Sequence, residues 1–311
     1  MKKILITGGA GYIGSKLATK LLSLNYKVTI IDSLKFSSNS INHLFKNKNF
    51  TFIYGDVRNK KLLSKELKKN EFIIPLAALV GAPLCEKNKK ESIQVNLESI
   101  KYLAKKINSS NKIIYLTTNS GYGIGEKGKY CDENSPLKPV SLYGRTKVDA
   151  EKIIMKSKNS VAFRLATVFG YSYRMRTDLL VNNFVFKAVK EKKLTIYEPH
   201  FRRNYIHIDD VVDGIIFSIK NFNRVRNNVY NLGLSSANLT KIMLAKKIKS
   251  HLKYLKIKIV KNKKDPDKRD YFVSNKKIES KGFKPTVPLN DGILELIKIF
   301  THRKNNFINN Y

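Results

Sequence analysis

The amino-acid sequence predicts an α/β fold in which a doubly wound parallel sheet is followed by a smaller mixed lobe. Short apolar runs, typical of strands buried on both faces, alternate with segments of helical periodicity in the first half of the chain. The first run ends in a glycine-rich turn that leads directly into a helical pattern. Beyond about residue 170 the strands become shorter and the pattern changes, which predicts a second, smaller unit.

The glycine-rich turn separates a predicted strand at residues 4–6 from a predicted helix. Its spacing, Gly-x-Gly-x-x-Gly from Gly9, is typical of turns whose backbone and following helix N-terminus approach the pyrophosphate of a dinucleotide. A second apolar run, residues 28–31, ends in Asp32, near the distance where an acid accepts ribose hydroxyl groups. We therefore predict a Rossmann-type domain that binds NAD, because Asp32 would repel the extra phosphate of NADP; the alternative is a structural turn beside a surface aspartate. The predicted cofactor contacts in this part are Gly8, Gly11, Tyr12, Ile13, Gly14 and Asp32.

Two further predicted strands add contacts to the cofactor site. Residues 50–54 form an apolar run, and Asp56 shortly after it can accept a hydrogen bond from an adenine amino group. The alternative role for Asp56 is the N-cap of the next helix, while Val57 offers apolar and backbone contact. Residues 72–78 are predicted to be the fourth strand, whose small residues let a ligand approach the backbone. The contacts predicted from these strands are Asp56, Val57, Leu76, Ala77 and Ala78.

A helical pattern over residues 91–107 precedes a predicted fifth strand at residues 112–118. Ligands of parallel sheets bind at the carboxyl ends of the strands. The hydroxyl groups of Thr118 and Ser120 are therefore expected at the ligand site. A long helix is predicted next, over residues 143–158.

This long helix begins with a tyrosine and a lysine four residues apart, Tyr143 and Lys147. Residues i and i+4 lie on one helix face, so both side chains can address one site. A nearby ammonium group stabilises phenolate and lowers the pKa of tyrosine from about 10, which would make Tyr143 a general base. The alternative is a packing tyrosine beside a solvated lysine. The hydroxyl-bearing strand end and the glycine turn upstream favour the catalytic role.

The chain is strongly basic, with 60 lysines and arginines against 24 acidic residues and a net charge of +36. The 49 lysines are scattered and arginines number only 11, whereas nucleic-acid readout favours arginine. We therefore predict no nucleic-acid partner, although the positive field should attract phosphorylated small molecules. Cys85 and Cys131 are too few for a disulfide framework or a zinc site. Since no apolar run is long enough for a membrane span and no signal-peptide pattern is present, we expect a cytoplasmic protein without a metal.

Several motifs together resemble a known family. The segments TGGAGYIG, GDVR, LAA, YGRTK, RLATVFG and RRNYIHIDDV resemble those of extended short-chain dehydrogenase/reductases that act on nucleotide sugars, over almost the whole chain. A closer resemblance, to the GDP-heptose 4-dehydrogenases of bacterial capsule biosynthesis, lies in LAALVGAPLC, SGYGIGE, RLATVFG, RMRTDLLVN, HFRRNYIH, LGLSSANLTK and DPDKRDYFVSN. The family resemblance also implies a homodimer formed through the Tyr143 helix and the helix near residues 91–107.

The resemblance implies a role for each residue of the predicted catalytic set. Tyr143 would take the proton from the C4 hydroxyl group of the sugar while hydride leaves C4 for the nicotinamide. Lys147 would hold the nicotinamide ribose and tune Tyr143. Thr118 would hydrogen-bond the same sugar oxygen, with Ser120 as the weaker candidate for a substrate contact.

Arginines supply the other predicted substrate contacts. Arg203 and Arg269 match family positions that bind the nucleotide diphosphate, a task that suits a planar guanidinium group; the alternative is a structural ion pair. Arg174 and Arg176 are in reach of sugar or phosphate. His207 matches a family histidine that is not the proton carrier, so we expect a structural role for it.

Sugar-nucleotide 4,6-dehydratases also resemble the chain, but they carry an Asp-Glu pair directly after the active-site threonine. Asn119 and Ser120 occupy these positions here, and neither titrates usefully. We therefore predict no dehydratase activity. The first hypothesis is NAD-dependent oxidation of a nucleotide sugar at C4, with a GDP-heptose as the implied substrate. The second is a 4-epimerase that uses the same residues, and the third is a nucleotide-binding protein without catalysis.

The second half of the chain is predicted to form most of the smaller lobe. Residues 1–170 are expected to be the NAD-binding domain and residues 171–311 the substrate-binding lobe, with a strand near residues 229–232 returning to the first sheet. Residues 302–311, rich in lysine and asparagine, are expected to fray. The other predicted elements are helices at residues 178–192, 209–220 and 238–252 and strands at residues 194–197 and 204–208.

Overall fold

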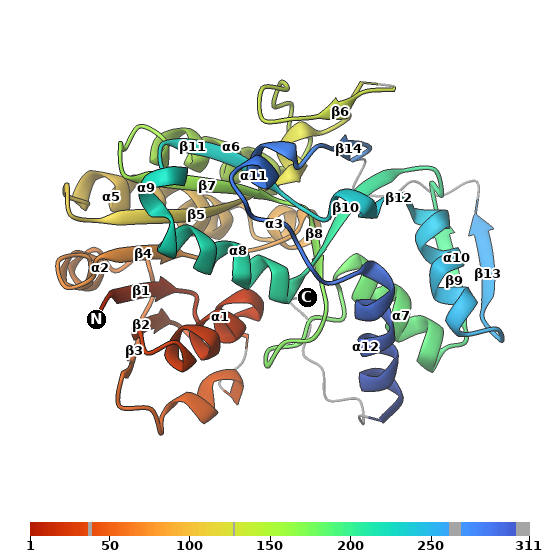
Figure 1. Cartoon of the computed structure of the whole chain (residues 1–311), viewed down its shortest axis with the longest axis horizontal. Helices are drawn as coiled ribbons and strands as arrows, with labels where there is room; N and C mark the ends of the chain where they lie inside the picture. Colours follow the sequence, from red (N-terminus) through yellow and green to blue (C-terminus); the bar gives the residue numbers. More distant parts are fainter. Residues whose placement is uncertain (37–38, 127, 261–268, 303–311) are drawn as a thin grey trace.

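The computed structural model describes residues 1–36, 39–126, 128–260 and 269–302. Its larger part is built on a seven-stranded parallel sheet with the strand order β11-β7-β5-β4-β1-β2-β3 (Figure 1). From β1 the chain winds outward through β2 and β3, and then crosses to β4 on the other side of β1, so the sheet is doubly wound. The strands are β1 (Lys3–Thr7), β2 (Lys27–Asp32), β3 (Phe50–Tyr54), β4 (Phe72–Pro75), β5 (Lys112–Thr118), β7 (Ser160–Leu165) and β11 (Asn228–Leu232).

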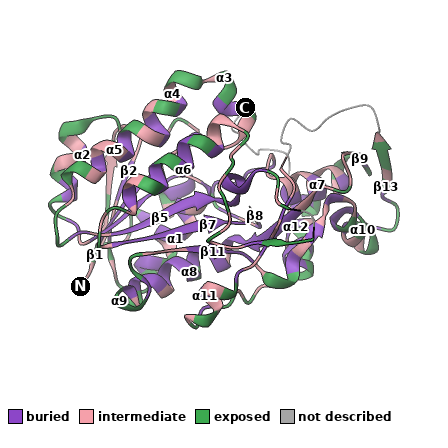
Figure 2. Ribbon diagram, turned by 90° about the horizontal axis from the view of Figure 1, so that it is seen from above, coloured by how far each residue is buried: buried purple, intermediate pink, exposed green. Residues whose placement is uncertain are grey.

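Helices cover both faces of this sheet because successive side chains of a strand point to opposite sides. Ile4 and Ile6 belong to the core with α1, α8 and α9, whereas Leu5 belongs to the core with α2, α5 and α6. Figure 2 shows the strands buried between helices whose outer faces are exposed. The predicted fold class is confirmed. The bounds of these helices are α1 (Tyr12–Ser23), α2 (Lys60–Leu67), α5 (Ser99–Lys106), α6 (Leu142–Ile154), α8 (Ile208–Lys220) and α9 (Phe222–Val225).

The smaller part combines short sheets with three longer helices around a core of its own. In the sheet β12-β10-β8, β10 pairs in parallel with β8 and antiparallel with β12. Phe169, Tyr205 and Phe300 are buried in the core under α7, α10 and α12. The bounds are β6 (Tyr130–Cys131), β8 (Thr167–Phe169), β9 (Lys193–Tyr197), β10 (Arg202–His207), β12 (Asn238–Thr240), β13 (Lys256–Val260), β14 (Phe272–Val273), α7 (Leu180–Lys190), α10 (Lys241–His251), α11 (Lys276–Ser280) and α12 (Leu289–His302).

The helical pattern predicted for residues 91–107 is divided in the structure. It consists of α4 (Lys89–Ile93), a π-helical turn η2 (Gln94–Glu98) and α5. From this turn the Asn96 side chain accepts the Leu79 N–H group at 2.8 Å and donates to the Leu79 carbonyl oxygen at 2.9 Å. The turn therefore anchors the segment after β4, which borders α3 (Ala82–Lys87).

Other element boundaries also differ from the prediction. The fourth strand ends at Pro75 rather than at residue 78, and α6 ends at Ile154, four residues early. The predicted helix at residues 238–252 begins only at Lys241, because Thr240 caps it by accepting the Met243 N–H group at 3.3 Å. β13 and α12 have no counterpart among the predicted elements.

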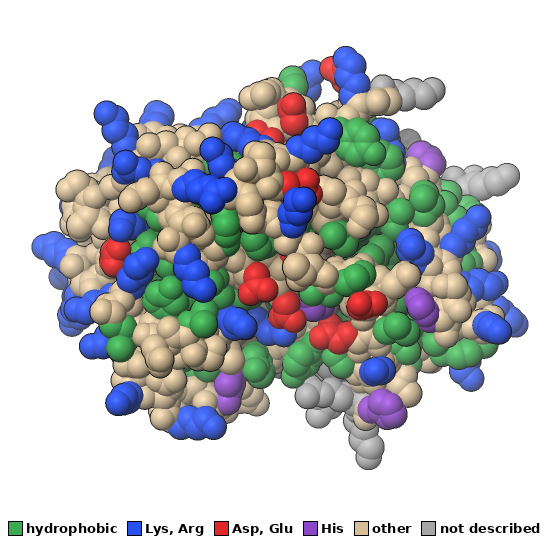
Figure 3. All heavy atoms as spheres, in the orientation of Figure 1, with side chains coloured by type: hydrophobic (Ala, Val, Ile, Leu, Met, Phe, Trp, Pro, Cys, Tyr) green, Lys and Arg blue, Asp and Glu red, His purple; other side chains and the backbone are tan. Residues whose placement is uncertain are grey.

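The polypeptide beyond residue 170 does not form one separate block. β11 pairs in parallel with β7 at the edge of the large sheet, and α8 packs on the same sheet face as α1. Residues 303–311, on which the predicted fraying depends, lie outside the described residues. Within the described ranges, no helix has both the length and the apolar character needed to cross a membrane. Figure 3 shows lysine and arginine side chains spread over the visible face rather than gathered in one stripe.

Candidate active site

Two adjoining cavities lie at the carboxyl ends of the central strands. The larger, of about 470 Å³, is lined by the glycine-rich turn, the end of β5, the start of α6 and residues of the second lobe. The smaller, of about 390 Å³, lies beside the ends of β2, β3 and β4. Gly8, Asp32, Phe36 and Ala78 line both cavities, which therefore form one cleft. A cleft of this size, between the strand ends and a second lobe, is typical of ligand sites in α/β proteins.

The structure brings all residues of the predicted site to this cleft. Phe36, Asp178 and Lys241 line it as well and are absent from the predicted set. Asp178 and Lys241 belong to the segments RMRTDLLVN and LGLSSANLTK, so the resemblance could have indicated them. No motif marks Phe36, which only the tertiary fold brings near the turn. The predicted residues that line the cleft are Thr118, Tyr143 and Lys147; Gly8, Gly11, Tyr12, Ile13, Gly14, Asp32, Asp56, Val57, Leu76, Ala77 and Ala78; and Ser120, Arg174, Arg203 and Arg269.

Close packing within the turn requires glycine at Gly8 and Gly14. Gly8 has a φ angle of 73°, and a Cβ atom there would lie 2.5 Å from the backbone nitrogen of Ala77. A Cβ atom at Gly14 would lie 2.5 Å from the carbonyl oxygen of Gly8. Among the described residues, no side chain caps the N-terminus of α1. The N–H groups of its first turn are therefore available to an anion in the cleft.

We expect Gly8→Ala to abolish cofactor retention and to destabilise the fold. Gly128→Ala is the matched control, because Gly128 has a similar φ angle of 79° but a Cβ atom there would meet nothing within 4 Å. In the control, the free energy of unfolding should fall only by the cost of a left-handed backbone conformation, about 1–2 kcal/mol. In Gly8→Ala it should fall by about 1–3 kcal/mol more, because Ala77 must move. Denaturant unfolding and the NAD content of the purified proteins measure both effects; equal behaviour of the two variants would contradict this account of the turn.

Asp32 lies at the end of β2 and faces the turn. Its Oδ2 atom accepts the Ala10 N–H group at 2.9 Å, and its Oδ1 atom accepts the Leu34 N–H group at 2.8 Å. Burial raises the pKa of this carboxyl group, and the two backbone hydrogen bonds oppose the rise. The bonds hold the carboxyl group at the junction of the two cavities, where the ribose contact is predicted.

Asp56 and Val57 line the smaller cavity. Both carboxylate oxygens of Asp56 accept hydrogen bonds from the Arg58 guanidinium group, at 2.9 and 2.6 Å, and these bonds lower the pKa of Asp56. The side chain that caps α2 is Asn59, which accepts the Leu62 N–H group at 3.1 Å. The alternative role of Asp56 as the N-cap is therefore wrong.

Two contacts fix the position of α6, which carries Tyr143 and Lys147. Ser141 caps the helix by accepting an N–H group of its first turn at 3.1 Å. Glu151 on the inner side of the helix forms a buried ion pair of 2.7 Å with Arg164 of β7. Because these contacts hold α6 at its start and near its end, Tyr143 and Lys147 are held in the cleft.

Burial has the largest effect on the pKa values of Tyr143 and Lys147. Burial raises the pKa of Tyr143 to about 12, and the charges that oppose the rise are Arg269 and Arg176. Burial also lowers the pKa of Lys147 to about 7, with its Nζ atom 4.1 Å from the centroid of the Tyr115 ring. Lys147 is not among the groups that oppose the rise of the pKa of Tyr143, because a lysine so deeply buried holds its own charge weakly at neutral pH. That Lys147 lowers the pKa of Tyr143 stays a prediction.

Polar side chains lead from Arg269 toward Tyr143. The Arg269 guanidinium group donates to Ser120 Oγ, and Ser120 Oγ lies 2.8 Å from Thr118 Oγ1. Hydrogen bonding by Thr118 opposes the rise of the pKa of Tyr143. Arginine can only donate, and a phenolate can only accept. When Tyr143 is ionised, Ser120 therefore donates its hydroxyl proton to Thr118, and Thr118 is free to donate its own to Tyr143. This series of hydroxyl groups is aligned to stabilise the phenolate form of Tyr143.

We expect Ser120→Ala to lower kcat by about 3- to 10-fold, the effect of one hydrogen bond. The pH at which activity rises should also move upward, because the phenolate of Tyr143 loses support. A pH–rate profile measures both effects, with the exposed Ser110→Ala as the control. An increase in KM with an unchanged pH profile would show instead that Ser120 only contacts the substrate.

Cationic side chains of the second lobe line the larger cavity. Buried Arg203 on β10 has its guanidinium group 5.7 Å from the Tyr271 ring centroid. Lys241 begins α10 and donates to a carbonyl group at the end of β9 at 2.6 Å. Arg176 forms a buried ion pair with Asp178. Together with the N-terminus of α1, these groups make the cleft suitable for ligands that carry phosphate.

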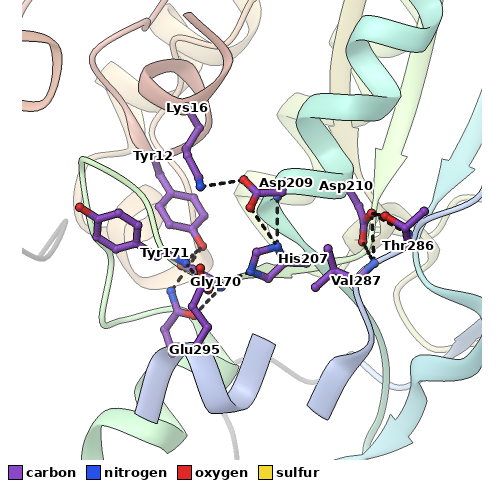
Figure 4. A network of polar contacts seen from close by, with 11 residues as sticks. Tyr12, Lys16, Gly170, Tyr171, His207, Asp209, Asp210, Thr286, Val287 and Glu295 are labelled. Carbon is purple, nitrogen blue, oxygen red and sulfur yellow. Dashed lines mark hydrogen bonds and ion pairs between the residues drawn. The ribbon is translucent and has the colours of Figure 1, made fainter. Parts of the chain in front are cut away.

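His207 belongs to a polar network beside the cleft rather than to its lining (Figure 4). Its Nε2 atom lies 3.0 Å from Glu295 Oε2 on α12, and its Nδ1 atom lies 3.7 Å from Asp209. Lys16 of α1 forms an ion pair of 2.7 Å with Asp209. Among the described residues, His207, Asp209 and Glu295 are close enough together to hold a metal ion. Their contacts instead connect α1, α8 and α12, in agreement with the structural role predicted for His207.

Comparison with known proteins identifies the family. The model of the "NAD dependent epimerase/dehydratase family" matches residues 4–233. The dTDP-D-glucose 4,6-dehydratase of Dictyostelium discoideum is 31% identical over 273 residues, which are 80% of this chain and 62% of that protein. This chain therefore spans less than two thirds of the length of that relative.

Solved structures agree with this result. UDP-glucuronic acid 4-epimerase from Bacillus cereus, in complex with UDP-glucuronic acid and NAD, is 28% identical with a TM-score of 0.81 and covers 96% of this chain and 98% of its own. UDP-glucose 4-epimerase of Thermus thermophilus, in complex with NAD, shares the fold with a TM-score of 0.83 at 20% identity, over 96% and 99% of the two chains. The chain belongs to the NAD-dependent epimerase/dehydratase family and is an NAD-dependent enzyme of that family.

Proposed function

We propose that this enzyme oxidises a nucleotide-activated sugar at C4. One observation carries the proposal: Thr118, Tyr143 and Lys147 line the same cavity as the glycine-rich turn. NAD fits the cleft, because only glycines fit the tight turn and Asp32 stands where a ribose binds. The bound cofactor supplies the hydride acceptor.

The residues of the cleft have distinct tasks in this proposal. Tyr143, as phenolate, accepts the proton of the C4 hydroxyl group, and Thr118 donates a hydrogen bond that stabilises the phenolate. Lys147 holds the nicotinamide ribose. Arg203 and Arg269 bind the diphosphate of the substrate and so place C4 near Tyr143.

We propose a GDP-heptose as the substrate. The support is the location of the segments that resemble the GDP-heptose 4-dehydrogenases. One residue of each of four such segments, namely Ala78, Arg174, Arg203 and Arg269, lines the larger cavity, so the resemblance extends to residues in reach of the substrate.

The purified enzyme, loaded with NAD, can be offered GDP-heptose, UDP-glucuronic acid, UDP-glucose and dTDP-glucose in turn. Oxidation at C4 should give absorbance of reduced cofactor and a product lighter by two hydrogen atoms. Faster turnover of GDP-heptose than of the other three supports GDP-heptose as the substrate. Turnover of only one of the other sugars would refute that choice and would make that sugar the substrate instead. No reduced cofactor with any sugar, and no change of any sugar, would refute oxidation at C4.

The second candidate is a 4-epimerase, favoured by the 28% identity to a UDP-glucuronic acid 4-epimerase. The same residues serve both reactions, but the epimerase returns the hydride to the sugar. A product of unchanged mass and no net reduced cofactor would support it. We also propose that dehydration does not occur, because Asn119 and Ser120 supply neither an acid nor a base; a product lighter by water would contradict this.

The assembly and the location of the enzyme are also proposals. We propose a homodimer formed through the region of α5 and α6, which pack against each other on one face of the sheet. Light scattering on the purified enzyme tests the dimer, and a monomer would refute it. We propose a cytoplasmic location, which fractionation of cells tests.

A further inference from the structure

We propose that Arg174 of the second lobe binds the pyrophosphate group of NAD and so retains the cofactor in the cleft. Arg174 is here a cofactor contact, rather than one of the substrate contacts that Arg203 and Arg269 supply. The inference depends on the NAD-binding cleft and not on which sugar the enzyme converts.

The burial of Arg174 is the first observation. The residue is only 4% exposed, and its Nη2 atom is buried without a hydrogen-bond partner among the described residues. Its guanidinium group lies 5.3 Å from the Phe36 ring centroid and lines the larger cavity. Burial, followed by repulsion from Arg176, lowers the pKa of Arg174 to about 10. An unpaired buried charge is costly, so a site of this kind is completed by an anion.

The position of Arg174 within the cleft identifies the anion. Phe36 lines both cavities together with Gly8 and Asp32, and Asp32 is close enough to raise the pKa of Arg174. This is the end of the cleft where the N-terminus of α1 begins. The pyrophosphate of a dinucleotide binds at such a helix N-terminus, and the planar guanidinium group matches two phosphate oxygens at once.

The loop that carries Arg174 is fastened to α1. Ser172 Oγ donates to the Tyr12 carbonyl oxygen at 2.6 Å and lies 3.1 Å from Ser15 Oγ. The Tyr12 hydroxyl group donates to the Gly170 carbonyl oxygen at 2.8 Å (Figure 4), and the Tyr173 ring stacks on His43 with 4.1 Å between centroids. Arg174 therefore needs little reordering to meet the cofactor. Preorganisation of this kind favours slow release of a ligand.

Cofactor retention and cofactor-free stability test the proposal without any turnover. Arg174→Met should lose NAD about 10- to 100-fold faster than the wild type during dialysis, measured by chromatography of the extracted dinucleotide. The cofactor-free Arg174→Met protein should unfold at the same denaturant concentration as the cofactor-free wild type, or at a higher one, because it no longer buries an unpaired charge. Arg226→Met, at an exposed arginine far from the cleft, is the control and should retain NAD as the wild type does.

Two further measurements separate the cofactor role from a substrate role. Binding of GDP and UDP to the NAD-loaded proteins should be the same for wild type and Arg174→Met. Weaker GDP or UDP binding with wild-type NAD retention would overturn the proposal. If Arg174→Met does not fold, Arg174→Lys, which keeps the charge but not the planar fork, should still lose NAD several-fold faster; wild-type retention by this variant would also overturn it.

Discussion

Replacement of Tyr143 by phenylalanine is expected to lower kcat for the sugar reaction by about 10²- to 10⁴-fold, the usual contribution of a positioned general base. The reason is the loss of the group that accepts the C4 hydroxyl proton. The other tyrosine of the larger cavity, Tyr12, donates its hydroxyl group to the Gly170 carbonyl oxygen, so it does not replace Tyr143. NAD should remain bound, because the phenylalanine ring keeps the packing of the cleft.

The measurement is kcat and KM with the best sugar from the substrate survey, together with the NAD content of each protein. Tyr130→Phe is the control, because Tyr130 is 57% exposed and lies outside the cleft lining. Activity of Tyr143→Phe within a factor of about three of the wild type would contradict the assignment of Tyr143 as the base. Loss of activity together with loss of NAD would indicate a cofactor effect instead.

The sequence predicts the large sheet well because each strand carries its own signal. Runs such as residues 4–6 and 113–116 are apolar throughout, and a strand buried on both faces needs that pattern. The π-helical turn η2 carries no comparable signal, since Asn96 has its partner in the segment after β4. The predicted fourth strand extends beyond the end of β4 because small apolar residues occur in the cleft lining as well as in strands.

The site residues also fall into two groups, those that local sequence motifs predict and those that only the tertiary fold reveals. Gly8, Asp32, Tyr143 and Lys147 belong to short motifs with local spacing, so their presence in one cleft could be expected. Phe36 comes from a segment whose approach to the turn depends on the whole fold. The pKa values could not be predicted either, because burial, rather than the spacing of Tyr143 and Lys147, has the largest effect on both groups.

Replacement of Lys147 by methionine is expected to stabilise the cofactor-free protein below neutral pH while it removes a predicted catalytic group. Burial lowers the pKa of Lys147 from 10.5 to about 7 in the folded protein. Between these pH values the unfolded chain binds more protons at this site than the folded chain does, so the free energy of unfolding of the wild type rises with pH. Below about pH 7 the whole penalty remains, on the order of 5 kcal/mol. Methionine does not titrate, so it removes both the penalty and this pH dependence.

The advantage of Lys147→Met over the wild type should therefore be largest near pH 6 and should shrink steadily toward pH 10. Denaturant unfolding of both proteins, stripped of NAD, at pH 6, 7.5 and 9 measures the difference. Lys152→Met is the control on the same helix, because Lys152 is exposed and its replacement should change the stability little at every pH. If Lys147→Met were less stable than the wild type at pH 6, the Lys147 ammonium group would have to be stabilised in the folded cleft. Lys147 could then lower the pKa of Tyr143 even without a ligand, and the simple spacing argument for the pair would hold after all.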